Sequence, residues 1–364
     1  MPSDREPLEA IILVGGKGTR LRPLTLSAPK PLLPTAGVPF LSHLLARAAA
    51  SGVTHVVLAT CYKASMFSEV FGDGSSFGLS MSYVTEDEPL DTGGGIANAA
   101  KALRGSNPAD PIVVLNCDIL SGHDLGAQLD LHVKSDAAVT LHLVPVQDPS
   151  RFGCVPTDQA GRVTAFLEKT PEPVTNQINA GCYVFRREVI EAIPRGRPLS
   201  VERETFPGLI ADGKLVMGYH ESAYWLDVGT PQAFVQGSCD LVLGKLPAPA
   251  LPGSTGERLL LHGAIVADGA NVSGGTTVGA GASVAPGAVV SGSVLFNEAS
   301  IGEGAVVRDS IIGAGAVIAA GAAVQDAMIG DGAVIGAGNE LARGIRVWPG
   351  TRLEPTTVRF SSDI

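Results

Sequence analysis

The sequence predicts an α/β domain with a mostly parallel, doubly wound sheet, followed by a left-handed parallel β-helix of hexapeptide repeats. Short apolar segments alternate with helical segments in the first part of the chain, which is typical of parallel sheets covered by helices. From about residue 254 the chain becomes rich in Gly, Ala and Val, and aliphatic residues recur at regular steps. A length of 364 residues is enough for two domains. We expect them at residues 1–237 and 254–364, with a Pro-rich connector at 238–253.

Composition narrows the class of function. The net charge of −10 argues against non-specific nucleic-acid binding. The uncharged stretch from Gly269 to Asn297 is interrupted by Pro286 and is too rich in Gly, Ser and Thr for a membrane helix. No apolar signal segment precedes the first predicted strand. The cysteines are dispersed without a C-x-x-C pair, which favours reduced thiols in a cytoplasmic protein: Cys61, Cys117, Cys154, Cys182 and Cys239.

The first predicted strand runs from Ala10 to Val14 and opens into a loop suited to phosphate. Three glycines, Gly15, Gly16 and Gly18, allow backbone N–H groups to approach an anion closely. The loop matches neither a Walker loop nor the dinucleotide G-x-G-x-x-G. A basic surface turn remains an alternative for G-G-x-G taken alone. The cations that favour a phosphate site follow at once: Lys17, Arg20, Arg22 and Lys30.

The next elements continue the alternation. Helical spacing predicts a helix from Pro39 to Ser51, which Gly52 ends. Short apolar segments predict strands at 56–59, 79–84 and 111–115. Because the carboxyl ends of parallel strands share one edge of a sheet, polar residues after these strands are candidates for a ligand site.

Two acidic positions follow such strands. Glu86 lies after strand 79–84, and its carboxylate can accept from the ring N–H and exocyclic amine of guanine; a solvated acidic turn of residues 86–88 is the alternative. Gly93 to Gly95 open a predicted helix whose N–H groups could face a nucleotide. Asp118 follows strand 111–115, where a carboxylate can hold a nucleotide's Mg²⁺ or be an ordinary polar strand end.

The C-terminal repeat has a step of six residues that shortens to five at 290–295, 307–312 and 324–329. The short steps are 17 residues apart, so three rungs form one coil. His262, the only histidine near the array, lies before the first full coil, which argues against a second, acyltransferase activity. Solenoids expose long flat faces, so we expect this domain to pack on the first domain or on another subunit, and homo-oligomers to form through it. The inward-facing positions are Val266, Val272, Val278, Val284, Val290, Leu295, Ile301, Val307, Ile312, Ile318, Val324, Ile329, Ile335, Leu341 and Val347.

The string G-G-K-G-T-R-L-R-P-L-T, followed by P-K-P-L-L-P, closely resembles the signature of the sugar-1-phosphate nucleotidyltransferases, whose catalytic domain is Rossmann-like. F-G-C-V, F-L-E-K-T, I-N-A-G and Y-W-L-D-V-G-T-P follow in the same order as in that family. With the hexapeptide tail, the resemblance covers almost the whole chain. The chain departs from the family at Asp91, where glycine is usual; Asp tolerates left-handed backbone angles better than most residues.

The resemblance implies a role for each matching residue. Arg20 would contact the leaving pyrophosphate, Lys30 the α-phosphate region, and Lys169 the sugar phosphate. Asp118 and Asp227 would hold Mg²⁺, the implied cofactor. Gly153, Glu168 and Asn179 would bind the sugar phosphate. The implied nucleotide-binding residues are Val14, Gly15, Gly16, Gly18, Thr19, Glu86, Thr92 and Gly93.

The resemblance also implies a reaction, in which GTP and mannose 1-phosphate give GDP-mannose and pyrophosphate. One alternative is the same chemistry with UTP, dTTP or ATP and glucose 1-phosphate or an amino-sugar 1-phosphate, because D-T-G-G-G resembles some uridylyltransferases. A second alternative is a catalytically silent subunit that binds a nucleotide sugar and regulates a partner. The joint presence of Arg20, Lys30, Asp118, Lys169 and Asp227 argues against silence.

Overall fold

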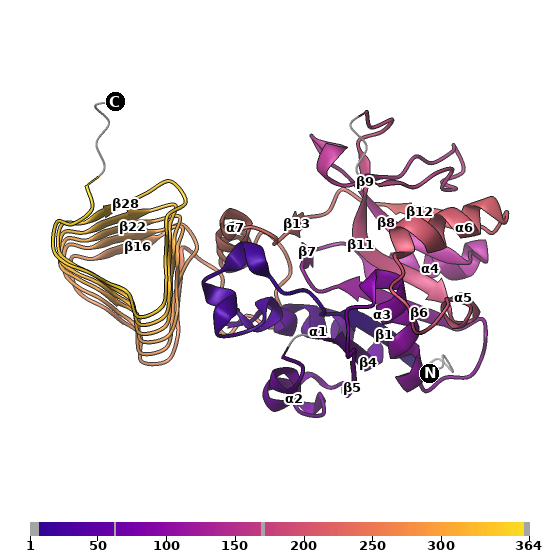
Figure 1. Ribbon diagram of the computed structural model, residues 1–364, viewed down its shortest axis with the longest axis horizontal. Helices are drawn as coiled ribbons and strands as arrows, with labels where there is room; N and C mark the ends of the chain where they lie inside the picture. Colours follow the sequence, from indigo (N-terminus) through magenta and orange to yellow (C-terminus); the bar gives the residue numbers. More distant parts are fainter. Residues whose placement is uncertain (1–6, 62, 169–171, 360–364) are drawn as a thin grey trace. The chain divides into compact units, whose positions relative to one another are not determined.

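The computed structural model of the chain describes residues 7–61, 63–168 and 172–359 (Figure 1). It divides into two compact units. The sheet unit comprises the residues up to Gly16 together with Leu44–Trp225, and the β-helix unit comprises Lys17–His43 together with Leu226–Ile364. Within the described residues, no helix combines the length and the apolar character that a membrane crossing requires.

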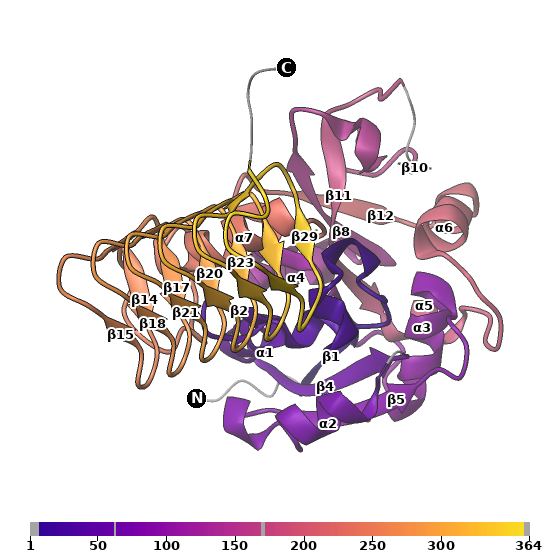
Figure 2. The same ribbon diagram turned by 60° about the vertical axis from the view of Figure 1, so that its left-hand side comes forward.

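The sheet unit is built on a nine-stranded sheet whose main path runs in the order β10-β9-β11-β6-β1-β4-β5, with β8 paired to β11 and β12 to β8 (Figure 2). The neighbours β6, β1, β4 and β5 are parallel, whereas β11 is antiparallel to β6 and β8. The predicted mostly parallel α/β sheet is therefore confirmed. Its strands are β1 (Leu8–Leu13), β4 (Val53–Thr60), β5 (Ser80–Thr85), β6 (Pro111–Asn116), β8 (Val139–Pro145), β9 (Gly153–Cys154), β10 (Leu167–Glu168), β11 (Gln177–Arg186) and β12 (Val216–His220).

Helices pack on this sheet. Helix α3 contacts β1 and β4, and α4 contacts β8, β11 and β12. The core between them contains fully buried side chains from the central strands, including Ile11, Val57, Val114 and Tyr183. The helix predicted from Pro39 to Ser51 is confirmed as α1. The α-helices up to residue 225 are α1 (Phe40–Ala50), α2 (Ser65–Phe71), α3 (Asp91–Ala99), α4 (Leu125–Ser135), α5 (Arg187–Glu191) and α6 (Phe206–Ala211). Two pairs of short strands accompany them: β2 (Pro34–Thr35) with β3 (Val38–Pro39), and β7 (Ile119–Ser121) with β13 (Trp225–Asp227).

The C-terminal part forms three parallel sheets, the architecture of the predicted left-handed β-helix, and Figure 1 shows its triangular outline. One sheet contains β14 (Arg258–Leu260), β17 (Thr276–Val278), β20 (Val294–Leu295), β23 (Ile311–Ile312), β26 (Met328–Ile329) and β29 (Arg346–Val347). The second contains β15 (Ile265–Val266), β18 (Ser283–Val284), β21 (Ser300–Ile301), β24 (Val317–Ile318), β27 (Val334–Ile335) and β30 (Arg352–Leu353). The third contains β16 (Asn271–Ser273), β19 (Val289–Ser291), β22 (Val306–Arg308), β25 (Ala323–Gln325) and β28 (Glu340–Leu341).

The predicted repeat register is confirmed. Val278 pairs with Leu295, which pairs in turn with Ile312 one coil further on. Of the inward-facing aliphatic residues that the repeat predicts, all but Val266 are buried, and Val266 packs partly buried against the same core. Stacking identical positions buries a continuous apolar column that no single coil could bury alone.

The shortened steps have a local cause. The turn at each one places a residue in the left-handed region: Gly292 has φ 54°, Asp309 φ 47° and Asp326 φ 44°. Gly, Asn and Asp adopt this conformation at the lowest cost. The same corner in the first and last coils, where the step is six, has two left-handed residues, Gly274 with Gly275 and Arg343 with Gly344, so the shortened corner has one of them fewer.

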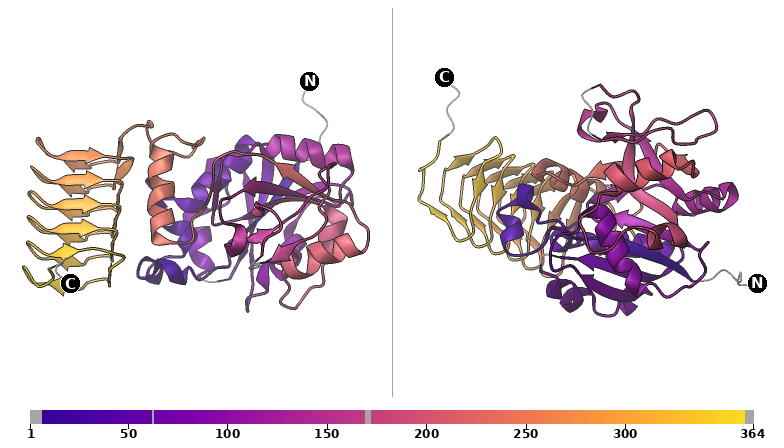
Figure 3. Two further views of the ribbon diagram at one scale, coloured as in Figure 1. Left: turned by 90° about the horizontal axis from the view of Figure 1, so that it is seen from above. Right: turned by 45° about the vertical axis from the view of Figure 1, so that its right-hand side comes forward.

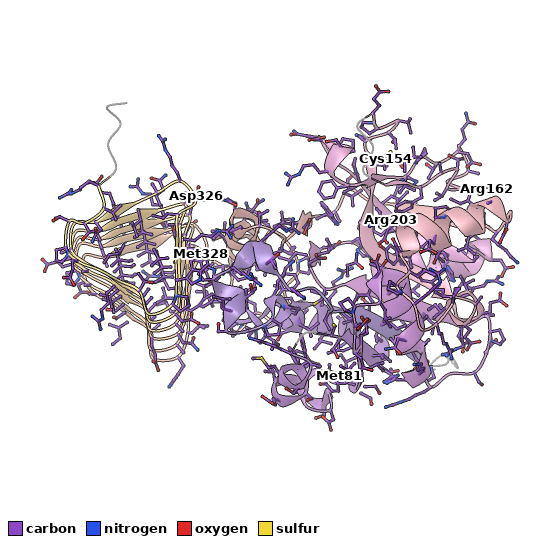
Figure 4. All side chains as sticks on the ribbon, viewed as in Figure 1. Met81, Cys154, Arg162, Arg203, Asp326 and Met328 are labelled. Atoms are coloured by element: carbon purple, nitrogen blue, oxygen red, sulfur yellow. The ribbon has the colours of Figure 1, made fainter. Side chains whose placement is uncertain are left out.

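Helix α7 (Pro231–Val242) packs against the sheet of the β-helix that contains β17 and β20 (Figure 3). It contacts β17 and β20, and Gln232 Nε2 donates to Asp326 Oδ1 at 3.0 Å. Asp326 lies on the edge of the β-helix, as Figure 4 shows. An ideal Cβ on Gly275 would lie 2.5 Å from the carbonyl oxygen of Cys239, so only glycine permits this close approach.

The division into units differs from the predicted domain boundaries. The predicted boundary at residue 237 falls inside α7, whose buried face includes Phe234, Val235 and Leu241. The segment Lys17–His43 groups with the C-terminal part of the chain and not with the sheet. The physical reason is packing: Ala36 N donates to Ser238 Oγ at 2.9 Å, and these residues are far apart in sequence.

Candidate nucleotide and sugar-phosphate site

The end of β1 is an exposed stretch of bare backbone. Val14 is buried and its N–H donates to the carbonyl oxygen of Ala59 at 3.0 Å, so the strand pairing extends one residue beyond β1. Gly15 and Gly16 are then exposed, and an ideal Cβ on Gly16 would meet no atom within 4 Å. Exposed peptide groups at the carboxyl end of a central parallel strand are open to a ligand.

Asp118 follows the neighbouring strand at the same edge. Strand β6 pairs in parallel with β1 in the register Leu13 to Asn116, and Cys117 N donates to Leu13 O at 3.1 Å. The half-buried Asp118 comes next. The prediction that the start of the glycine loop and Asp118 share one edge of the sheet is confirmed.

The remainder of the glycine-rich loop is held together by its own side chains. Gly18 is left-handed, with φ 58°, and its carbonyl oxygen accepts from Thr25 Oγ1 at 2.9 Å. A Cβ on Gly18 would lie 3.0 Å from Thr25 and 3.1 Å from Lys30, so a larger residue would push this loop open. Lys30 begins the 3-10 helix η3 (Lys30–Leu32) and is only 8% exposed. Thr19, by contrast, is exposed.

Arg20 and Asp227 meet at a glycine. An ideal Cβ on Gly229 would lie 2.6 Å from Arg20 Nη2 and 2.9 Å from Asp227 Oδ1. Both charged head groups therefore occupy the space that a side chain would need. Two of the predicted functional residues, 207 positions apart in sequence, are neighbours within the β-helix unit.

Glu86 is half-buried and folded back onto the start of α3. Its Oε2 accepts from Leu90 N at 3.0 Å, and its Oε1 lies 2.8 Å from the ideal Cβ position of Gly95. Burial raises the pKa of this carboxyl, and the hydrogen bond from Leu90 N lowers it by less. Asp91 stands where the resembled family usually has glycine. Its φ of 59° lies in the left-handed region, a conformation that glycine adopts easily and that Asp tolerates better than most residues.

The structure gives Thr92 and Gly93 a different part from the predicted nucleotide contacts. Gly93 N and Gly94 N both donate to the carbonyl oxygen of Leu199, at 2.7 and 3.1 Å. The Thr92 hydroxyl donates to Glu202 Oε2 at 2.7 Å and accepts from Val201 N at 3.0 Å. These groups are occupied because the segment around residues 199–202 packs on the start of α3. Contact of Thr92 and Gly93 with a nucleotide stays a prediction.

The predicted sugar-binding residues come together on three adjacent strands. Gly153 in β9 pairs with Glu168 in β10, and Cys154 pairs with Ile178 in β11. Asn179 follows directly, so Gly153, Glu168 and Asn179 are neighbours along the backbone of the sheet unit. Lys169 lies outside the described residues.

The side chain of Asn179 is fixed before any ligand binds. Its Nδ2 donates to Tyr183 Oη at 2.8 Å, and its Oδ1 accepts from Gly181 N at 3.1 Å. The pairing of β11 with β8 is irregular between Asn179 and Tyr183, which is where this local bond forms. One N–H hydrogen and one oxygen lone pair of the amide remain for a hydroxyl group.

Sequence reasoning missed the residues that support this region. Tyr183 is fully buried, and burial raises the pKa of its hydroxyl well above the usual value; the hydroxyl also hydrogen-bonds Asn116. Trp225 Nε1 donates to Ala180 O at 3.0 Å, and its ring meets Phe152 edge-on at 5.5 Å. Asn116 lies in the motif N-C-D and Trp225 in the motif Y-W-L-D, each beside a predicted metal aspartate. Their position within these motifs is the sequence feature from which a supporting role could have been predicted.

The candidate metal ligands are two carboxylates, Asp118 and Asp227, which belong to different units. Within the part of the chain that the structure describes, there is no group of three or more His, Cys, Asp or Glu side chains able to hold a metal. A metal bound with few protein ligands completes its shell with water and substrate oxygens, as Mg²⁺ does with nucleotides. Carboxylate oxygens are suitable donors for such an ion, so each of the two residues fits it by its chemistry.

Comparison with known proteins agrees with both parts of the chain. Residues 9–242 match the family described as nucleotidyl transferase, and residues 255–354 match the family described as GMPPB C-terminal domain. The chain is 57% identical over 358 residues to a mannose-1-phosphate guanylyltransferase of Mycobacterium tuberculosis, covering 98% of this chain and 99% of that protein.

More distant relatives match about two thirds of the chain. A mannose-1-phosphate guanyltransferase of Candida albicans is 37% identical over 235 residues, which is 64% of each protein. Among solved structures, HddC from Yersinia pseudotuberculosis complexed with GMP-PN is 27% identical, with a TM-score of 0.54 over 64% of this chain and 99% of that one.

Proposed function

We propose that this chain, which belongs to the nucleotidyl transferase family, transfers GMP from GTP to mannose 1-phosphate and releases pyrophosphate. The observation that carries the proposal is the 57% identity, over almost the full length of both chains, to a mannose-1-phosphate guanylyltransferase. The open backbone after β1, the loop bearing Arg20 and Lys30, and Asn179 beside Gly153 support it.

In this reaction a phosphate oxygen of mannose 1-phosphate attacks the α-phosphorus of GTP, and the bond to the β-phosphate oxygen breaks. Pyrophosphate leaves opposite the incoming oxygen. No covalent bond to the protein forms, so catalysis consists of positioning and charge stabilisation. The exposed N–H groups of Gly15 and Gly16 would bind nucleotide phosphate, with Val14, Gly18 and Thr19 shaping the backbone around them.

Each charged side chain is assigned to a different phosphate group of the nucleotide. Arg20 would stabilise the leaving pyrophosphate, and Lys30 would lie near the α-phosphate. Arg20 has the planar fork of donors that suits phosphate oxygens. Lys30 is held by burial and by two flanking prolines, which limits the freedom that a lysine normally loses on binding.

We assign the divalent ion to Asp118 and Asp227 on the chemistry of the two carboxylates and their match to the family motifs, and we propose Mg²⁺ as the ion. When bound with nucleotide, it would neutralise phosphate charge and hold the triphosphate in one conformation. Glu86 remains our candidate for reading guanine. The bond that Glu86 Oε2 accepts from Leu90 N already orients the carboxylate, leaving Oε1 as the free acceptor.

On the sugar side, Asn179 and Glu168 would bind hydroxyl groups of the hexose, and Lys169 would bind its phosphate. Gly153 pairs with Glu168 along the backbone. We further propose that the protein acts in the cytoplasm as a homo-oligomer formed through its β-helix. Size-exclusion chromatography with light scattering would test the oligomer, and a monomer at micromolar concentration would contradict it.

The decisive experiment is a substrate panel. Purified protein would be given GTP, UTP, dTTP or ATP with mannose 1-phosphate, glucose 1-phosphate or an amino-sugar 1-phosphate, and pyrophosphate release would be measured. We expect the highest kcat/KM for GTP with mannose 1-phosphate. A preference for another pair would overturn the substrate assignment and keep the reaction class, whereas no release with any pair would support a silent regulatory subunit.

A further inference from the structure

The β-helix contacts the signature loop directly. Arg346, at the start of β29, donates from Nη1 to the carbonyl oxygen of Arg22 at 3.0 Å. Ser27 Oγ donates to Asp331 Oδ2 at 3.1 Å. Both contacts join residues more than 300 positions apart, and both lie within the β-helix unit.

These contacts add to the bonds that the loop makes within itself, such as the one from Thr25 Oγ1 to Gly18 O. Arg22 ends the short helix η1 (Thr19–Leu21), and its N–H donates back to Thr19 O at 3.2 Å. Pro23 follows and offers no N–H group. Arg20, in the middle of η1, is exposed, so its own turn does little to fix its guanidinium. The bond to the Arg22 carbonyl therefore restrains the turn that carries Arg20.

Arg346 is itself held in a charged setting. It lines a cavity of about 50 Å³ together with Asp309 and Asp326, the two left-handed aspartates of the short corners. Asp326 Oδ1 also accepts from Gln232 in α7 at 3.0 Å. Asp309 and Asp326 thus line the same small cavity as the Arg346 side chain. The corner that shortens the repeat thus places acidic groups next to the arginine that reaches the loop.

We propose that Arg346 is a positioning residue for nucleotidyl transfer, acting through the Arg22 carbonyl to hold Arg20 beside Gly229. The proposal rests on the role proposed above for Arg20 at the leaving pyrophosphate. It gives the β-helix a part in the reaction without contact with substrate. A charged donor on a carbonyl is among the stronger hydrogen bonds, so its loss should be measurable.

The first test is kinetic and uses the full-length protein. We expect Arg346→Ala to lower kcat about three- to tenfold, as loss of one charge-assisted bond typically does. Arg346→Lys, which keeps a donor, should retain most of the activity. Arg352→Ala is the matched control, because Arg352 is an exposed arginine on the next strand, β30, and among the described residues no hydrogen bond joins it to the loop.

The second test separates positioning from general stability. If Arg346 acts through Arg20, Arg346→Ala should have little further effect on kcat in an Arg20→Lys background. Effects that multiply fully, an unchanged kcat in Arg346→Ala, or a loss explained by a lowered melting temperature would each overturn the proposal.

A third measurement does not depend on substrate. Hydrogen exchange at the amides of Leu21, Arg22 and Leu26, which bond within the loop, should become several-fold faster in Arg346→Ala and stay unchanged in Arg352→Ala. Unchanged exchange in Arg346→Ala would refute the proposed restraint even if the substrate assignment is correct. Faster exchange with an inactive wild-type protein would refute the proposed function and not the restraint.

Discussion

Single side chains in this protein are fixed by short polar contacts near the ends of strands. Asp227 lies beside Arg20 because Gly229 leaves space for both, and Asn179 is held by Tyr183 and the Gly181 amide. Such contacts orient a polar group in advance, so less entropy is lost when a charged substrate binds. The next two predictions concern substitutions that each remove one charged group from the proposed site.

Removing either proposed metal carboxylate should weaken the requirement for Mg²⁺. We expect Asp118→Asn and Asp227→Asn to raise the half-saturating Mg²⁺ concentration at least about tenfold and to lower kcat/KM roughly a hundredfold, since lost charge stabilisation at such centres typically costs about 3 kcal/mol. Magnesium titrations of initial rates would measure this. Asp87→Asn, at an exposed acidic position, is the control. Normal titrations in both variants would remove the metal assignment.

Lys169→Ala should act on one substrate more than the other. Because the lost cation is assigned to the sugar phosphate, KM for mannose 1-phosphate should rise about tenfold or more while KM for GTP changes less than about twofold. Steady-state kinetics with each substrate varied would check this, with Lys214→Ala as an exposed control. Equal changes in KM for the two substrates would show that Lys169 does not bind the sugar phosphate.

Secondary structure elements in the β-helix are joined by a polar ladder at the short corners. Ser293 N donates to Thr276 Oγ1 at 3.2 Å, Ser310 N to Ser293 Oγ at 3.2 Å, and Ala327 N to Ser310 Oγ at 3.1 Å. Each hydroxyl thus satisfies a buried N–H one coil further on. At the tight turn these backbone N–H groups have no partner in regular strand pairing, and the hydroxyl groups of the ladder accept their hydrogen bonds instead.

Ser293→Ala should therefore destabilise the β-helix. The change leaves the buried Ser310 N–H without its acceptor, and a loss of about 1–2 kcal/mol in the free energy of unfolding is expected. Urea unfolding would measure it. Ser300→Ala is the matched control, because Ser300 is half-buried and its hydroxyl accepts from another side chain, Ser283 Oγ at 3.3 Å, and among the described residues not from a buried backbone N–H. Equal stability of the two variants would mean that the ladder does not stabilise the domain.

The molecule as a whole should lose stability in weak acid because of buried neutral histidines in the sheet unit. His142, 1% exposed, stacks on His123, 4% exposed, with ring centroids 3.8 Å apart. Burial, followed by the nearby Arg47 charge, lowers the pKa of His123 to about 2 and that of His142 to about 3. Between those values and about pH 6.5 the unfolded chain binds protons that the folded chain does not.

His142→Leu should remove part of this pH dependence. On lowering the pH from 7.5 to 5.0, the wild type should lose on the order of 2 kcal/mol more free energy of unfolding than the variant, since each pKa unit corresponds to about 1.4 kcal/mol. Urea unfolding at both pH values would show it, with His262→Leu as an exposed control. Parallel losses in the wild type and His142→Leu would contradict the assignment.

The sequence by itself determined the parallel strands around the glycine loop, the 17-residue coil and the buried aliphatic columns. These features follow from periodic burial along the chain, which can be read locally. The shared edge of Gly15 and Asp118 followed from the same logic, because parallel strands end at one edge.

Only the tertiary structure decided which polar groups are already occupied. The Leu199 carbonyl accepts from the Gly93 and Gly94 amides, so these two N–H groups are already engaged within the protein. Packing also placed residues 17–43 with the C-terminal part of the chain and brought Arg346 to the Arg22 carbonyl. These contacts join residues distant in sequence, and they depend on the close packing of whole elements, which no local pattern encodes.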